Sequence, residues 1–391
     1  MKKLTLTFII TFFCIPLIFV PTTVLSGGHE PKEWEGEGTK IEFQSIPMIT
    51  MQNILNRGSY GETQTISGTL NFPANAPDKN VPAVILLHGG GGISTPQAHW
   101  IKTLNSIGLA TFMVDSNWAR RNCKKDKKNK SFKVGGPYCN GTHRGMLRIV
   151  DAYRALELLS KHPRIDSTRI GCLGTSLGGV GCLYQSVKRF QKMWGTPGIE
   201  FAASVPMYPV CTTKWKEDDV MSDEPIRIHI GELDQYGSAE SCVKYVERLH
   251  LKGKDITITV YPGVHHGFDE KITGPKGPMT TFKQKGRFFS KCNFEENTDS
   301  SVLNEENFGE GFPQIITQVG FNEWLASAEE KKKKQLFKYI KKGNKYGYVS
   351  PTIIFDKSCT TKVATGKYNK EAAKKVTGLV KEFFTTTFKL Q

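Results

Sequence analysis

The sequence predicts an α/β fold in which helices cover a doubly wound, mostly parallel sheet. From about residue 83 to residue 261, short apolar runs of strand length alternate with longer helical stretches. Such an alternation is typical of parallel strands joined by right-handed helical crossovers. The run over residues 83–87 is apolar throughout, as expected for a central strand buried on both faces. The length of 391 residues allows one large domain with an insertion, or at most two domains.

The other strands follow in chain order. Residues 40–45 and 63–72 have the pattern of antiparallel edge strands that lead into the sheet. Further strands are expected over residues 170–173, 225–230 and 256–261. Polar or glycine-rich residues follow the carboxyl ends of several of these strands, so we expect the catalytic residues in these loops.

One strand end carries the most informative motif. Residues 174–178 read Gly-Thr-Ser-Leu-Gly, a G-x-S-x-G sequence, and a helix is expected afterwards over residues 180–192. A tight turn between strand and helix lifts the serine hydroxyl clear of the sheet, and the two glycines leave room for the sharp corner. The pattern alone is weak evidence, so its place between a strand and a helix carries the argument. Ser176 is the candidate nucleophile.

A serine hydroxyl needs an imidazole to take its proton and a carboxylate to hold that imidazole in the right tautomer. Asp234 follows the expected strand over residues 225–230, and His266 follows the strand over residues 256–261. The order serine, acid, histidine is that of α/β-hydrolases. We therefore predict a catalytic triad of Ser176, Asp234 and His266.

Neighbouring residues leave alternatives open. Glu232 is a second carboxylate in the acid loop, and His265 directly precedes His266. Asp234 could also cap the helix that starts near Ser238.

The central apolar run ends in His88 and four glycines. A glycine-rich loop lets backbone N–H groups approach an acyl oxygen. We predict an oxyanion hole made by the N–H of Gly90, with Gly91 as the alternative, and the N–H of Leu177. His88 is expected to hold the loop in shape. A phosphate-binding loop is the other interpretation, but the sequence contains no G-x-x-x-x-G-K-[ST] motif.

Several short segments together carry a family resemblance: LHGGGG at 87–92, GLATFMVDS at 108–116, DAYRAL at 151–156, GTSLGG at 174–179, YPVC at 208–211, GELD at 231–234, YPG at 261–263, HGF at 266–268 and YNKEAA at 368–373. Over about residues 60–270 and the final helix, the sequence resembles the dienelactone hydrolase family of α/β-hydrolases. The resemblance implies an α/β-hydrolase fold. The founding enzymes use a cysteine nucleophile where Ser176 stands, which points to ordinary ester hydrolysis rather than to dienelactone as substrate.

These observations predict an exported serine hydrolase that cleaves carboxylic esters through an acyl-enzyme. No metal or organic cofactor is implied, and the expected partner is a small-molecule ester. Two alternatives stay open: a serine peptidase or amidase, which shares every catalytic part, and a non-catalytic envelope-binding protein on a hydrolase scaffold. The sequence does not indicate the acyl chain length or the oligomeric state.

The N-terminus predicts export. Lys2 and Lys3 precede an uncharged, mostly apolar run over residues 4–25. This pattern is typical of a secretory signal peptide, here residues 1–26, and indicates a periplasmic or secreted protein. The run is long enough to span a bilayer, so an uncleaved membrane anchor is the alternative.

The mature chain is predicted to be one α/β-hydrolase domain over residues 27–391. Its core is expected at about 40–270 and 366–391, with an insertion at about 271–365 before the C-terminal helix. This insertion is much longer than the corresponding link in the family that the sequence resembles. It leaves the sheet beside the predicted histidine, where lids of hydrolases usually lie. Four aromatic residues of the insertion are candidates for lining an acyl pocket or for packing a small separate core: Phe308, Phe312, Phe321 and Trp324.

Cysteine usage agrees with export. Of nine cysteines, Cys14 lies in the signal peptide, and the other eight can pair in an oxidising compartment. Three disulfides are expected from positions along the chain: Cys123 with Cys139, Cys211 with Cys242, and Cys292 with Cys359. For Cys172 and Cys182, free buried thiols are at least as well supported as a bridge. Zinc is not expected, because no C-x-x-C spacing occurs.

The chain is basic. Fifty-three Lys and Arg against 37 Asp and Glu give +16, and removal of Lys2 and Lys3 leaves +14. Much of the excess lies at 124–130 and 331–342. A solvated lysine-rich surface is the first interpretation, and electrostatic association with an anionic envelope surface or substrate is the second. Nucleic acid is not expected as a partner, because no recognised binding motif accompanies the charge.

Overall fold

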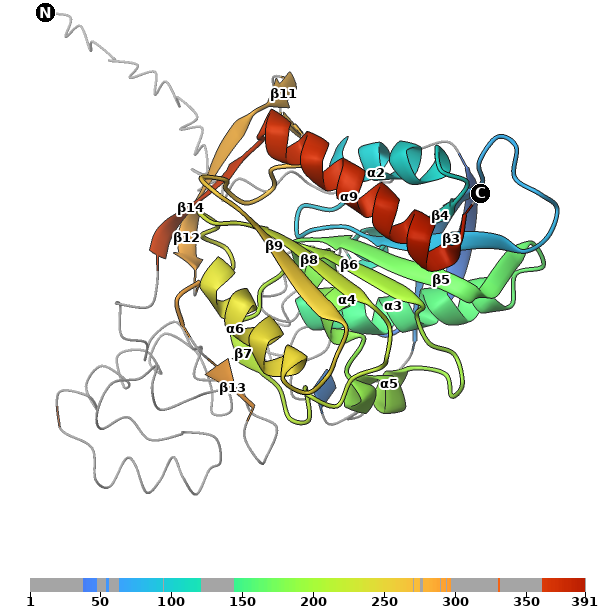
Figure 1. Ribbon diagram of the computed structural model, residues 1–391, viewed down its shortest axis with the longest axis horizontal. Coiled ribbons are helices and arrows are strands. Elements are labelled where there is room, and N and C mark those ends of the chain that lie inside the picture. The colour runs from blue at the N-terminus through green and yellow to red at the C-terminus, as the bar shows by residue number, and fades with distance from the viewer. Residues whose placement is uncertain are drawn as a thin grey trace, which may run out of the picture.

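The computed structural model (Figure 1) describes the following parts of the chain: residues 38–47, 54–55, 63–93, 95–120, 144–269, 271–274, 277–288, 290–292, 294–296, 330 and 361–390. The predicted signal peptide, the basic runs at 124–130 and 331–342, and the four aromatic residues of the insertion lie outside these ranges. So do Cys123, Cys139 and Cys359.

Eight strands form one sheet in the order β1-β2-β4-β3-β5-β6-β8-β9. In chain order its strands are β1 (Thr39–Ser45), β2 (Gln64–Asn71), β3 (Val81–Leu87), β4 (Ala110–Asp115), β5 (Ile165–Thr175), β6 (Ala203–Met207), β8 (Ile226–Gly231) and β9 (Ile256–Tyr261). β1 pairs antiparallel with β2, and β2 pairs antiparallel with β4. All pairs from β4 to β9 are parallel. The predicted pair of antiparallel strands leading into a mostly parallel sheet is confirmed.

The winding of the sheet reverses direction at β3. The chain passes from β3 to β4 on one side and then returns to β5 on the other side of β3. In doubly wound sheets, ligands bind at such a reversal, outside the carboxyl ends of the strands. The glycine loop follows β3 and the G-x-S-x-G turn follows β5, so both lie at this reversal.

Helices cover both faces of the sheet, which completes the α/β-hydrolase fold. The described helices are α2 (Thr95–Asn105), α3 (Arg144–Ser160), α4 (Leu177–Tyr184), α5 (Lys188–Trp194), α6 (Ala239–His250), α9 (Lys370–Phe388) and the short 3-10 helix η1 (Trp118–Arg120). α2 and α9 lie together on one face, while α3, α4 and α6 lie on the other (Figure 1). Among the described residues, no helix is both long and apolar enough to cross a membrane.

The single helix predicted over residues 180–192 is wrong: α4 and α5 are separate helices. Val187 adopts an extended conformation, with φ −71° and ψ 117°, and forms a β-bridge with Met221. The side chain of Gln185 turns inward and donates a hydrogen bond to Ser204 Oγ over 2.9 Å. These tertiary contacts interrupt the helix where the local sequence pattern favours its continuation.

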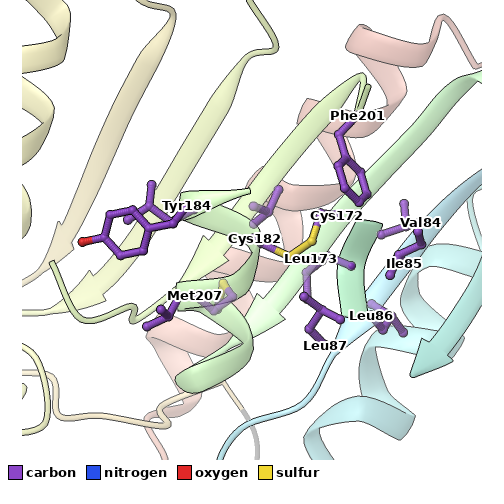
Figure 2. Close-up of a cluster of buried hydrophobic side chains, with 14 of the residues drawn as sticks. Val84, Ile85, Leu86, Leu87, Cys172, Leu173, Cys182, Tyr184, Phe201 and Met207 are labelled. Atoms are coloured by element: carbon purple, nitrogen blue, oxygen red, sulfur yellow. A yellow bond between two sulfur atoms is a disulfide. The ribbon is translucent and has the colours of Figure 1, made fainter. Parts of the chain in front are cut away.

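The core at the centre of the sheet contains a disulfide. Every residue of β3 is buried, as its apolar run predicts. Beside it, Cys172 of β5 bonds to Cys182 of α4, with 5.6 Å between their Cα atoms (Figure 2). Free thiols at these two positions were as well supported by the sequence as a bridge. The structure pairs them, because α4 packs directly over the end of β5.

The described ends of the insertion form short strand pairs. β10 (Ile272–Gly274) pairs with β11 (Gly277–Met279), and β13 (Phe294–Glu295) pairs with β7 (Thr213–Lys214). β12 (Thr281–Phe288) pairs antiparallel with β14 (Thr361–Lys367). We call this last pair the β12–β14 ribbon. It stands at the carboxyl end of the parallel strands (Figure 1).

Candidate active site

Ser176 lies at the sharp turn between β5 and α4. Its backbone has φ 55° and ψ −114°, a conformation that residues other than glycine rarely adopt. A side chain at Gly174 would overlap the carbonyl of Gly178, and a side chain at Gly178 would overlap the carbonyl of Leu87. Both glycines of the motif are therefore required by close backbone approach.

The structure brings Ser176, His266 and Asp234 together in a line. His266 follows β9, and Asp234 follows β8. The Nε2 atom of His266 lies 3.0 Å from Ser176 Oγ, and its Nδ1 lies 2.6 Å from Asp234 Oδ2. Because an ionised carboxylate only accepts hydrogen bonds, Nδ1–H donates to Asp234, which leaves Nε2 free to accept from the serine hydroxyl.

The loop after β8 fixes the acid. Asp234 Oδ1 accepts hydrogen bonds from the N–H groups of Tyr236 (2.8 Å) and Gly237 (3.1 Å). Its side chain is fully buried at the pair with His266. Each oxygen of the carboxylate thus has its own partners, and the carboxylate cannot rotate without losing one set.

The structure separates the competing residues from this line. Ser238, not Asp234, caps α6: its hydroxyl accepts from the N–H of Ser241 at 3.4 Å. Glu232 instead accepts from the N–H of Gly263 over 2.7 Å. The Nδ1 atom of His265 has no hydrogen-bond partner among the described residues.

Two tyrosine rings flank the imidazole of His266. The Tyr236 ring stacks on it with 4.3 Å between centroids and 27° between planes, and the Tyr208 ring meets it edge-on at 4.6 Å. Tyr208 donates its hydroxyl hydrogen to Asp269 Oδ1 over 2.8 Å. The indole N–H of Trp100 donates to Asp269 Oδ2, also over 2.8 Å. Burial raises the pKa of Asp269, although these two hydrogen bonds act in the opposite direction.

The glycine loop after β3 lies against the serine turn. A side chain added at Gly89 would come within 3.3 Å of Ser176 Cβ, and one at Gly90 within 3.3 Å of Leu177 Cδ1. His88 Nδ1–H donates to the carbonyl of Gly89 over 2.7 Å, and His88 Nε2 accepts from the N–H of Ser116 over 3.3 Å. A peptide unit is planar, and its C=O and N–H point in opposite directions. Holding the Gly89 carbonyl therefore also directs the N–H of Gly90.

A buried arginine of α3 donates hydrogen bonds that hold the same glycine loop. Arg148 of α3 is 1% exposed. Its Nε–H donates to the carbonyl of His88 over 3.3 Å, and its Nη2 donates to Asn117 Oδ1 over 2.9 Å. Asn117 Nδ2 in turn donates to the carbonyl of Gly90 over 3.4 Å. No sequence pattern indicates a role for Arg148, Asn117 or the two tyrosines, because their roles depend on contacts between distant segments. Of these four residues, only Tyr236 lies close in sequence to a predicted catalytic residue, two positions after Asp234.

A second disulfide lies at this end of the sheet. Cys211, after β6, bonds to Cys242 of α6, and their Cα atoms are 4.9 Å apart. Cys292 is buried and disulfide-bonded. Within the described ranges, no group of three or more His, Cys, Asp or Glu side chains is placed to hold a metal ion.

The chain matches the dienelactone hydrolase family over residues 66–283, more than half of its length, and therefore belongs to this family. It is a hydrolase, and its substrate is a small molecule. A curated relative from Bradyrhizobium sp is named "Probable 2-oxo-3-(5-oxofuran-2-ylidene)propanoate lactonase". That protein is 23% identical over 208 residues, which cover 51% of this chain and 78% of the relative.

Solved structures of esterases are also similar. Thermogutta terrifontis esterase 2, phosphorylated by paraoxon, is 16% identical with a TM-score of 0.40, over 52% of this chain and 80% of that chain. A dienelactone hydrolase-like promiscuous phosphotriesterase from metagenomic libraries is 15% identical with a TM-score of 0.43, over 62% of this chain and 91% of that chain.

Proposed function

We propose that this protein is an exported serine esterase that works through an acyl-enzyme. The observation that carries this proposal is the line of hydrogen bonds from Ser176 through His266 to Asp234, with 3.0 Å and 2.6 Å between the bonded atoms. This geometry is the one that a hydroxyl nucleophile, its base and the orienting acid require.

In the first half of the reaction, Ser176 Oγ attacks the acyl carbon of the ester. His266 Nε2 takes the serine proton and then donates it to the departing alcohol oxygen. Asp234 holds the imidazole in the tautomer with hydrogen on Nδ1 and stabilises the positive charge that forms on the ring. In the second half, His266 removes a proton from water as the water oxygen attacks the acyl carbon. The bond from that carbon to Ser176 Oγ then breaks, His266 returns the proton to Ser176 Oγ, and the acid is released.

The N–H groups of Leu177 and Gly90 are the proposed oxyanion donors. Leu177 is the first residue of α4, where N–H groups have no acceptor within the helix. No described backbone hydrogen bond uses the N–H of Gly90. Donors that are already oriented stabilise the tetrahedral oxyanion without reorganisation during the reaction.

The proposed substrates are carboxylic esters. A lactone, the substrate class in the name of the Bradyrhizobium relative, is a cyclic ester and undergoes the same acyl transfer. A serine hydroxyl attacks such carbonyl carbons once a base has taken its proton. Amides share the mechanism but have a poorer leaving group, so a comparison of the two is part of the test.

Export is proposed from the predicted signal peptide. The disulfides Cys172–Cys182 and Cys211–Cys242 support this proposal, because such bonds persist in oxidising compartments. Sequencing of the N-terminus of the protein recovered from the envelope or the medium tests it: cleavage after Ser26 is expected, and an intact Met1 end in the membrane fraction would indicate an uncleaved anchor.

A panel of esters of increasing acyl length, with matched amides, tests the activity. The wild type should hydrolyse each ester about a hundredfold or more faster than the matched amide. Ser176→Ala should lose turnover while staying folded. Hydrolysis of amides at a rate similar to that of esters would favour the peptidase or amidase alternative. Absence of turnover on the whole panel, together with no labelling of Ser176 by a fluorophosphonate, would favour a non-catalytic protein.

A further inference from the structure

The β12–β14 ribbon, which belongs mostly to the insertion, contacts both loops that carry the proposed base and acid. The backbone N–H of Lys367 donates to the carbonyl of His266 over 2.9 Å, and Gly366 forms a parallel β-bridge with His266. Two residues earlier in β14, the N–H of Thr365 donates to Gln235 Oε1 over 3.0 Å. One strand thus ties the histidine loop to the loop that begins at Asp234.

Aromatic side chains of the ribbon reach the same place. Phe288 meets the ring of Tyr236 edge-on, with 4.9 Å between centroids and 67° between planes. The Phe282 ring lies 6.3 Å from the Tyr236 ring at 49°. Phe282 also fills the space beside Gly366 so closely that a side chain at Gly366 would overlap it. The Tyr236 ring in turn stacks on His266 at 4.3 Å.

These ring contacts run without a break from the ribbon to the imidazole. Asp234 holds the His266 ring at one edge through Nδ1, but a single hydrogen bond allows the ring to tilt about that contact. Tyr236 covers the face of the ring and limits the tilt. Phe288 and Phe282 keep Tyr236 in that position, and the backbone bonds from Thr365 and Lys367 keep the ribbon there.

We propose that the β12–β14 ribbon is a positioning element for the general acid–base: Phe288 and Phe282 hold Tyr236 against His266, so that Nε2 stays aimed between Ser176 Oγ and the leaving oxygen. This inference rests on the proposed serine esterase mechanism. It assigns a catalytic purpose to the described ends of the insertion.

The leaving group of the ester separates positioning from a purely structural role. An alkoxide must receive a proton from His266 as it departs, whereas a nitrophenolate departs without one, so a tilted imidazole slows an alkyl ester more than a nitrophenyl ester of the same acid. A displacement of about 1 Å in a catalytic group can cost about a hundredfold in rate. A loss of folded protein, by contrast, lowers both rates by the same factor.

The experiment compares kcat/KM for an alkyl and a nitrophenyl ester of one acid in the full-length mature protein, with thermal unfolding measured in parallel. The variants are Phe288→Ala, Phe288→Leu and Tyr236→Ala. Tyr236→Phe retains the stacked ring. The matched control is Val363→Ala, since Val363 lies on the same ribbon with 39% of its surface exposed.

Phe288→Ala and Tyr236→Ala should lower kcat/KM about tenfold or more for the alkyl ester and about threefold or less for the nitrophenyl ester. Tyr236→Phe, which keeps the stacked ring, should recover most of the alkyl-ester rate that Tyr236→Ala loses, and Val363→Ala should resemble the wild type. Phe288→Leu keeps apolar volume and gives the same test if the alanine variant does not fold.

If the wild type is active and all ring-removing variants keep the wild-type ratio between the two esters, the positioning role is wrong while the esterase proposal stands. If the wild type hydrolyses neither ester, the esterase proposal fails, and the positioning role fails with it.

Discussion

Cys172 and Cys182 are bonded to each other across the turn that carries Ser176. The bond joins β5 to α4, and the two Cα atoms are 5.6 Å apart at a sequence separation of 10. Ser176 therefore lies inside a small covalent loop. Its backbone holds an unfavourable conformation, with φ 55°, which persists only where the surroundings determine it strongly. The disulfide is one of the contacts that do so.

Replacing both cysteines, as Cys172→Ala with Cys182→Ala, should lower the free energy of unfolding by about 2–3 kcal/mol, since the bond restricts a short loop in the unfolded chain. Urea denaturation of the oxidised proteins measures the effect. Adding a reductant should destabilise the wild type further than the variant, in which only the remaining disulfides can be reduced. Equal midpoints for oxidised wild type and variant would contradict this assignment.

The two adjacent histidines should differ sharply in importance. His266→Ala removes the group 3.0 Å from Ser176 Oγ, so kcat should fall on the order of 10⁴-fold or more. His265→Ala should retain activity within about threefold, because the base position at Ser176 Oγ is occupied by His266 Nε2, and the Nδ1 atom of His265 has no hydrogen-bond partner among the described residues. Steady-state hydrolysis of a short ester measures both. A larger loss in His265→Ala than in His266→Ala would mean that His265, and not His266, is the base.

Arg148 should affect turnover more than substrate binding. Arg148→Met keeps the buried volume but removes the hydrogen bonds to His88 and Asn117, so the proposed Gly90 donor loses its support. We expect kcat to fall about 10–100-fold with KM within about threefold. Arg154→Gln, on the same helix but partly exposed at 28%, is the control and should be unchanged. A folded Arg148→Met protein with wild-type kcat would contradict the role of this arginine in the oxyanion loop.

Stability should depend on pH through a buried acid remote from the active site. Burial raises the pKa of Glu224 from an ordinary value of 4.5 to about 8, although Ser204 and Gln185 donate hydrogen bonds to it. The folded state thus binds more protons than the unfolded state between these values. Protonated Glu224 therefore contributes its full share to the free energy of unfolding below pH 4.5. As the pH rises from 4.5 to about 8 this contribution is lost, by up to about 1.4 kcal/mol per pH unit.

Glu224→Gln keeps a neutral side chain of the same shape at every pH. The free energy of unfolding of the wild type minus that of this variant should therefore fall steadily between pH 4.5 and 8 in denaturant titrations. Taking the difference cancels other groups that titrate in this range, including His229, whose pKa burial and Arg227 lower to about 4. A difference that is constant across the window would show that Glu224 is not protonated in the folded protein.

The fold and the three aligned side chains could be predicted because their signals are local. The apolar run before His88 and the glycines around Ser176 each determine a strand or a turn within a few residues. Asp234 and His266 were found because parallel strands bring the residues at their carboxyl ends to one edge. Chain order then supplied the assignment.

Contacts between distant segments could not be predicted. The break between α4 and α5 depends on the bridge from Val187 to Met221, which local helical periodicity does not record. Pairing of Cys172 with Cys182 depends on how α4 packs over β5. The edge-on contact of Phe288 with Tyr236 joins segments on either side of β9, so neither residue carries a signal for it alone.

Covalent labelling of Ser176 tests the central claim most directly. The mature protein is treated with a fluorophosphonate, and the adduct is located by peptide mass spectrometry. A serine activated by His266 should form one adduct, on the peptide that contains Ser176, and the labelling should vanish in Ser176→Ala and slow greatly in His266→Ala. An adduct that persists in Ser176→Ala, or ester hydrolysis by a wild-type protein that is never labelled, would contradict the proposed nucleophile.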